Sequence, residues 1–137
     1  ITNESQASEL FGPQSGENGD KIAETLIKKF DLRLVALTYR RTINANRNNI
    51  WAILCDGNNS VASKKYEIDM VDRVGGGDAF AAGLIYARMH GYDLRKSVDF
   101  AEAASCLKHS VEGDFNLATA EEVDALICEA GKGEIRR

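Results

Sequence analysis

Residues 72–83 read Asp-Arg-Val-Gly-Gly-Gly-Asp-Ala-Phe-Ala-Ala-Gly, and this stretch decides the fold class. The glycines at 75–77 precede an apolar, alanine-containing segment, which predicts a helix running to about His90, with Gly91 ending it. The first N–H groups of a helix have no intrahelical acceptor, and the helix dipole adds partial positive charge there. Because glycines leave these groups unshielded, the stretch predicts an anion site suited to phosphate.

Asp78 follows the glycines directly. A carboxylate there would repel a phosphate, but it suits a base that accepts the proton of a hydroxyl attacking phosphorus. A simpler interpretation is a tight turn at Gly75–Gly77, with Asp78 capping the helix. The stretch contains no GxxxxGK[ST] P-loop, and a GxGxxG dinucleotide pattern would need glycine where Phe80 stands. On these residues alone, the phosphate site and the capped turn both remain open.

Upstream of the glycines, the pattern predicts helices and short strands. We expect a helix that starts at Thr2 or Asn3 and ends at Gly12, a second helix at residues 20–30, and strands at Leu32–Tyr39, Ile50–Cys55 and Ser60–Ile68. The polar residues 40–49 are typical of a loop, and Asp-Gly-Asn-Asn at 56–59 predicts a hairpin turn.

Downstream, two further helices are expected. The first runs from Asp93 or Leu94 to His109, and the second from a capping box at Thr119–Glu122 to about Ala130. The order of helix, strand, hairpin and helices predicts an α/β protein with a layered sheet.

Composition limits the classes of function. The 137 residues are 44% hydrophobic and suffice for one soluble domain with a sizeable core, while the net charge of -4 argues against binding to nucleic acid. No apolar run approaches the roughly 20 residues that span a bilayer. The three cysteines have no CxxC spacing, which indicates buried thiols of a reduced compartment, and neither they nor the two histidines predict a metal site.

The order Asp72, Gly75–Gly77, Asp78, Phe80 resembles the signature Asp-x-x-Gly-[Ala/Gly]-Gly-Asp-x-Phe of ribokinase-like carbohydrate kinases, also called the phosphofructokinase B-type family. The small residues at 81–83 continue the pattern. The resemblance covers nearly the whole chain, but only the C-terminal part of a family member. It implies an α/β fold, namely the C-terminal Rossmann-like portion of a ribokinase-like fold. Residues 1–137 would then be the nucleotide-binding and catalytic half, without the N-terminal substrate and lid half.

The resemblance also implies site residues and cofactors. Asp78 would be the catalytic base, the amides of Gly75, Gly76 and Gly77 the anion hole, and ATP with Mg²⁺ the phosphoryl donor. Nucleotide contacts are expected from Thr38, Arg40, Gly75, Gly77 and Glu102. Arg40 fits a surface charge equally well, and Glu102 stands where some relatives have Asn beside the adenine.

Residues 107–116 resemble 2-keto-3-deoxygluconate kinases in particular. This likeness implies a cytoplasmic enzyme that phosphorylates a small sugar or sugar acid, with no membrane or nucleic-acid partner, and with a homo-oligomer as an open option. Two departures stand out. Gln6 replaces the Glu of an Asn-x-x-Glu motif that forms a second shell for Mg²⁺, and Tyr39 to Arg41 stand where many relatives have glycines.

Two other functions stay open. One is a non-catalytic nucleotide-binding or interaction module, which Gln6 and the missing half favour. The other is a kinase of the same family that acts on fructose, ribose or a nucleoside. Whichever sugar the kinase phosphorylates, the isolated chain is expected to be inactive toward it.

Overall fold

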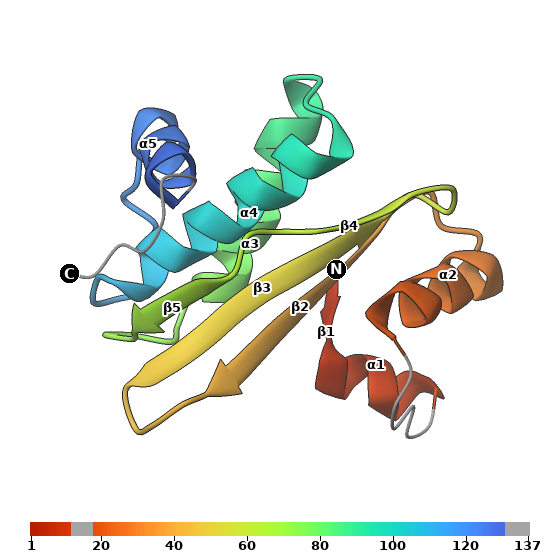
Figure 1. The fold of residues 1–137 in the computed structure, drawn as a ribbon, viewed down its shortest axis with the longest axis horizontal. Helices are drawn as coiled ribbons and strands as arrows, with labels where there is room; N and C mark the ends of the chain where they lie inside the picture. The colour runs from red at the N-terminus through yellow and green to blue at the C-terminus, as the bar shows by residue number, and fades with distance from the viewer. Residues whose placement is uncertain (12–17, 131–137) are drawn as a thin grey trace.

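The computed structural model describes residues 1–11 and 18–130, in which one sheet lies between helices on both faces (Figure 1). The helices are α1 (Glu4–Phe11), α2 (Gly19–Phe30), α3 (Gly76–Met89), α4 (Leu94–His109) and α5 (Ala120–Ala130). The strands are β1 (Thr2–Asn3), β2 (Val35–Thr42), β3 (Arg47–Cys55), β4 (Ser60–Ala62) and β5 (Tyr66–Asp69). This confirms the expected α/β class. None of the helices in these residues is long and apolar enough to cross a bilayer.

The sheet has the order β1-β2-β3-β4, with β5 also paired to β3. β1 runs parallel to β2, and the other pairs are antiparallel. The strand expected at Ser60–Ile68 is wrong as a single element, because β4 and β5 pair with different parts of β3. Between them, the Ser63 hydroxyl accepts the N–H of Ala52 at 2.9 Å, in place of a backbone carbonyl. A side chain therefore interrupts the ladder.

The loop expected at residues 40–49 is also wrong. β2 continues to Thr42 and β3 begins at Arg47, so the turn is only residues 43–46. Polar groups form this end of the hairpin: the Asn44 side chain accepts the N–H of Arg47 at 2.9 Å, and the Arg47 guanidinium bonds to Asp69 at 3.2 Å. Cross-strand polar pairing replaces the apolar pattern that a strand prediction relies on.

Other boundaries follow from local hydrogen bonds. Asp31 ends α2 in the left-handed conformation, and the Leu32 N–H bonds to the Ile27 carbonyl at 3.0 Å, so β2 begins at Val35 rather than at Leu32. The expected hairpin turn at 56–59 is confirmed, because the Asp56 carboxylate accepts the N–H of Asn59 at 2.7 Å. β1 was not expected. Gly12, the expected end of the first helix, lies outside the described residues.

Successive side chains of β2 point to opposite faces of the sheet, and this decides which of them face α3 and α4. Val35 and Leu37 pack on the α1 and α2 face, whereas Ala36 packs with Phe80 of α3 on the opposite face. Because successive side chains of a strand point to opposite faces, Thr38 and Arg40 lie on the same side as Ala36. The strand therefore presents both residues toward the layer that contains α3 and α4.

α3 and α4 pack closely because Gly83 has no side chain. A Cβ added at Gly83 would lie 3.0 Å from the Ala101 Cα and 3.1 Å from the Ala104 Cβ. These distances are shorter than ordinary van der Waals contacts between carbons. The expected helices at 75–90 and 94–109 are confirmed within a residue or two, and this contact fixes how near they lie.

We expect Gly83→Val to lower the free energy of unfolding by about 1–3 kcal/mol, because the added methyl groups overpack the contact between α3 and α4. Ala82→Val is the matched control: Ala82 is exposed on the same helix, so its cost should stay below about 1 kcal/mol. Urea denaturation measures both. Equal losses in the two variants would contradict the proposed close contact.

Candidate functional site

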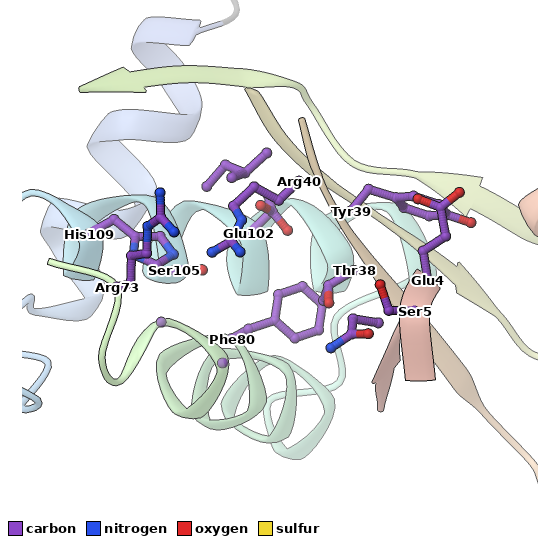
Figure 2. Close-up of a pocket in the computed structure, with 14 residues that line it drawn as sticks. Glu4, Ser5, Thr38, Tyr39, Arg40, Arg73, Phe80, Glu102, Ser105 and His109 are labelled. Atoms are coloured by element: carbon purple, nitrogen blue, oxygen red, sulfur yellow. The ribbon is translucent and has the colours of Figure 1, made fainter. Parts of the chain in front are cut away.

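A cavity of about 350 Å³ opens where the start of α3 meets β2 and the C-terminal half of α4 (Figure 2). β2 contributes Thr38 and Arg40, and α4 contributes Glu102 and His109. The backbone of the glycine run forms another wall, and the beginning of α1 contributes to the lining. Elements far apart in the sequence thus meet around one space.

Two of the three glycines are required by packing. Gly75 precedes α3 in the left-handed conformation, with φ of 80°, and a Cβ there would lie 2.2 Å from the Asp114 carbonyl oxygen. A Cβ on Gly76 would lie 2.2 Å from the Cε1 atom of His109. At Gly77, by contrast, a Cβ meets no atom of the described residues within 4 Å. Gly77 lines the cavity, so the space over it is open.

Asp72 ties the glycine run to the segment after α4. Its carboxylate accepts the N–H groups of Val74 and Gly113, both at 3.0 Å. These backbone hydrogen bonds, that of Val74 first, hold the pKa of Asp72 below its ordinary value. Asp72 therefore fixes the entrance to α3.

His109 is buried and lies against the glycine run. Its Nδ1 donates to the Asp72 carbonyl at 2.9 Å, because a carbonyl oxygen only accepts. Burial is the main cause that lowers the pKa of His109, and the positive charges of Lys108, Arg40 and Arg73 lower it further. The ring is thus neutral near pH 7, and positive charge gathers around it.

Arg40 and Arg73 both line the cavity, beside the first turn of α3 (Figure 2). The N–H groups of that turn, including those of Gly76 and Gly77, have no intrahelical acceptor. Two guanidinium groups next to a helix N-terminus form a site for a polyanion such as a phosphate chain.

Glu102 introduces an acid into this positive environment. It is only 3% exposed, and burial raises its pKa to about 8. Near neutral pH it is therefore mainly a neutral carboxylic acid.

The structure brings together five of the predicted site residues: Thr38, Arg40, Gly76, Gly77 and Glu102. Gly75 stands just before the helix and does not line the cavity. Asp78 is exposed in the first turn of α3, also outside the lining. The residue that precedes the helix is Gly75, so Asp78 does not occupy the capping position of the simpler interpretation.

Two of the lining residues that sequence reasoning missed are Arg73 and His109. Arg73 stands inside the quoted motif, but no spacing rule gives it a role. His109 was given no site role from sequence, and it is buried and lines the cavity. The only sequence signal for His109 is its position at the end of a helix that packs on the motif.

Asn3 and Gln6 form a reciprocal cap at the start of α1. The Asn3 side-chain oxygen accepts the N–H of Gln6 at 2.9 Å, and the Gln6 side-chain oxygen faces the Asn3 N–H at 3.4 Å. An amide performs this role as a carboxylate would.

Across residues 1–11 and 18–130, no group of three or more His, Cys, Asp or Glu side chains could hold a metal ion. These residues therefore do not fit a magnesium site built from protein ligands alone.

Neighbouring glycines offer a test of the packing. Gly76→Ala should lower the free energy of unfolding by about 1–3 kcal/mol, because the methyl group collides with the His109 ring. Gly77→Ala should leave stability unchanged or raise it by up to about 1 kcal/mol, since alanine favours a helix. Thermal or urea denaturation distinguishes them, and similar losses in both variants would contradict this geometry.

Glu102 should make stability depend on pH. Between its ordinary pKa of 4.5 and about 8, the unfolded chain loses the proton that the folded chain keeps. This group therefore lowers the free energy of unfolding by up to about 1.4 kcal/mol for each pH unit of rise in that window. Glu102→Gln removes this pH dependence. The free energy of unfolding of Glu102→Gln relative to wild type should therefore rise from pH 5 to pH 8 in denaturation experiments. A constant difference would mean that Glu102 ionises normally.

Comparisons with known proteins agree with this architecture. The model of the pfkB family carbohydrate kinases matches residues 1–120. The structure of 2-dehydro-3-deoxygluconokinase from Thermotoga maritima superposes with a TM-score of 0.85 at 38% identity, over 92% of this chain and 40% of that one.

Two curated relatives match shorter parts of their own sequences. An ATP-dependent ribose-1-phosphate kinase from Halopiger xanaduensis is 36% identical over 64 residues, which are 47% of this chain and 22% of the relative. A 2-dehydro-3-deoxygalactonokinase from Haloferax volcanii is 26% identical over 106 residues, or 77% of this chain and 31% of the relative. The chain thus spans less than half the length of each of these proteins. The family match over residues 1–120 confirms the resemblance seen in the glycine motif: the chain belongs to the pfkB family of carbohydrate kinases.

Proposed function

We propose that this chain supplies the nucleotide-binding and catalytic part of an ATP-dependent sugar kinase. One observation carries the proposal: the first turn of α3, with Gly76 and Gly77, shares a cavity with Arg40 and Arg73, and Asp78 stands in that same turn. A phosphate chain and an acceptor hydroxyl can then meet at one helix end.

The cavity is the nucleotide side of the proposed site. Arg40 and Arg73 neutralise the phosphates, Thr38 and Glu102 contact the nucleotide, and the amides of the glycine run bind the transferring phosphoryl group. Arg40, which from sequence fitted a surface charge equally well, lines the cavity, and this favours the phosphate role. Mg²⁺ belongs here to the MgATP substrate, held mainly by phosphate oxygens and water.

Asp78 is the proposed base. Its carboxylate takes the proton from the sugar hydroxyl, the hydroxyl oxygen bonds to the γ-phosphorus, and the bond from that phosphorus to the bridging oxygen breaks to leave ADP. The exposure of Asp78 supports this role, because a base must be reachable by the acceptor.

The preferred substrate in this proposal is 2-keto-3-deoxygluconate. The Thermotoga maritima and Haloferax volcanii relatives are both named for 2-dehydro-3-deoxy sugar acids, and the first matches over 92% of this chain. The ribose-1-phosphate kinase matches only 64 residues. The chain spans 40% of the Thermotoga maritima enzyme. The proposal therefore assigns the selection of the sugar to residues outside this chain. It also predicts that the isolated chain binds nucleotide without turning over sugar.

We expect Asp78→Asn to reduce kcat by roughly 10²–10⁴-fold while the Kd for ATP changes little, because the amide cannot accept the proton. The test is a coupled kinase assay on the full-length protein that carries this chain, together with calorimetric titration of ATP. Glu121→Gln is the matched control, since it removes an exposed carboxylate from the first turn of α5 and should leave kcat unchanged.

A panel of 2-keto-3-deoxygluconate, fructose, ribose and a nucleoside separates the alternatives. Activity with the keto acid that collapses in the variant supports both the base and the substrate. A different preferred sugar with the same collapse keeps the mechanism and replaces the substrate. Equal rates in wild type and variant, or no turnover with intact ATP binding, would favour the non-catalytic nucleotide-binding or interaction module.

A further inference from the structure

Glu102 is a buried acid that no other described residue pairs with. Its side chain projects from α4, is 3% exposed and lines the same cavity as Arg40 (Figure 2). Within the residues that the structure describes, no hydrogen bond reaches its carboxyl group, and the ion pairs of 4.0 Å or less are both made by Arg47. Its carboxyl group opens onto the cavity without a described protein partner, so it is available to bond a ligand there.

The charge of the expected ligand decides which form of Glu102 can meet it. A phosphate chain between Arg40 and Arg73 would be repelled by an ionised carboxylate in the same small cavity. A protonated carboxyl group instead offers an O–H donor in addition to its acceptor oxygen. Acceptors are abundant on a nucleotide, in its phosphate oxygens, ribose and base nitrogens.

We propose that Glu102 binds the nucleotide as a neutral carboxylic acid, which donates its O–H to an acceptor atom of the nucleotide. This inference rests on the proposed function, because it assumes that the cavity holds a nucleotide. Its consequence is a pH limit: when Glu102 ionises, the donor is lost and a negative charge faces the phosphates. Nucleotide affinity should therefore fall as the pH rises.

The groups around Glu102 leave a usable window of pH. The guanidinium groups of Arg40 from β2 and of Arg73 line the same cavity, and the pKa of His109 is held below its ordinary value by burial. Burial, followed by the charge of Glu102, raises the pKa of Cys106 to about 12, and burial also raises that of Tyr66. Among the described acids, Glu4 at the start of α1 also lines the cavity, and Asp99 on α4 accepts the N–H of Lys64 at 2.7 Å. Between about pH 7 and pH 9.5 the charge change at Glu102 should dominate.

The experiment compares wild type with Glu102→Gln and Glu102→Met in the full-length protein. Glutamine keeps an N–H donor and cannot ionise, whereas methionine has a similar length and offers neither donor nor charge. The Kd for ADP is measured by calorimetry from pH 6.5 to pH 9.5, and circular dichroism checks that each variant is folded. If Glu102→Met does not fold, comparing the pH profiles of wild type and Glu102→Gln still tests the proposed role of Glu102.

We expect wild type and Glu102→Gln to bind ADP alike at pH 6.5, and Glu102→Met to bind it roughly 2- to 12-fold more weakly, the value of one neutral hydrogen bond. On going to pH 9.5, wild type should lose roughly 10- to 30-fold in affinity relative to Glu102→Gln, because only the protonated fraction binds well. Parallel profiles for wild type and Glu102→Gln would overturn the proposal. So would equal affinities of Glu102→Met and Glu102→Gln at pH 6.5.

The same titrations separate this inference from the proposed function. A wild-type protein that binds ADP with an affinity independent of pH retains its nucleotide site, and only the role of Glu102 fails. A folded wild-type protein that binds no ADP at any pH contradicts the nucleotide site itself, and the inference falls with it.

Discussion

The contact between the backbone of Gly76 and the imidazole ring of His109 constrains the rest of the site. A Cβ on Gly76 would lie 2.2 Å from that ring, so the first turn of α3 rests directly on the end of α4. The ring in turn is held by the Asp72 carbonyl, and the Asp72 carboxylate holds Gly113. This chain of contacts aims the positive end of α3 at the cavity.

Local patterns predicted much of the fold and less of the site. Helices 75–90 and 94–109 and the turn at Asp56–Asn59 were predicted, because capping, apolar spacing and turn chemistry act over a few residues. The ends of the hairpin at Thr42 and Arg47 were missed, because polar pairing across strands stabilises them. The glycine motif identified the helix N-terminus, whereas His109 enters the site through tertiary packing that no spacing reports.

Glu102 shows why composition and charge alone mislead at such a site. From sequence it counts as one more negative charge in a chain of net charge -4, but burial makes it mainly neutral near pH 7. Arg40 and Arg73 therefore face a polar but nearly uncharged wall, and the cavity as a whole favours anions. Burial of this acid lowers the stability of the fold locally, as is common at functional sites.

The three glycines of the motif have different reasons to be small. Gly75 needs a left-handed backbone next to the Asp114 carbonyl, and Gly76 needs space for the His109 ring, so packing explains both. No described protein atom explains Gly77, which faces the open cavity. A tight turn that served only to start a helix would gain stability from alanine at that position. Glycine at 77 is therefore better explained by a ligand that approaches its backbone N–H closely, which favours the phosphate site over the simple turn.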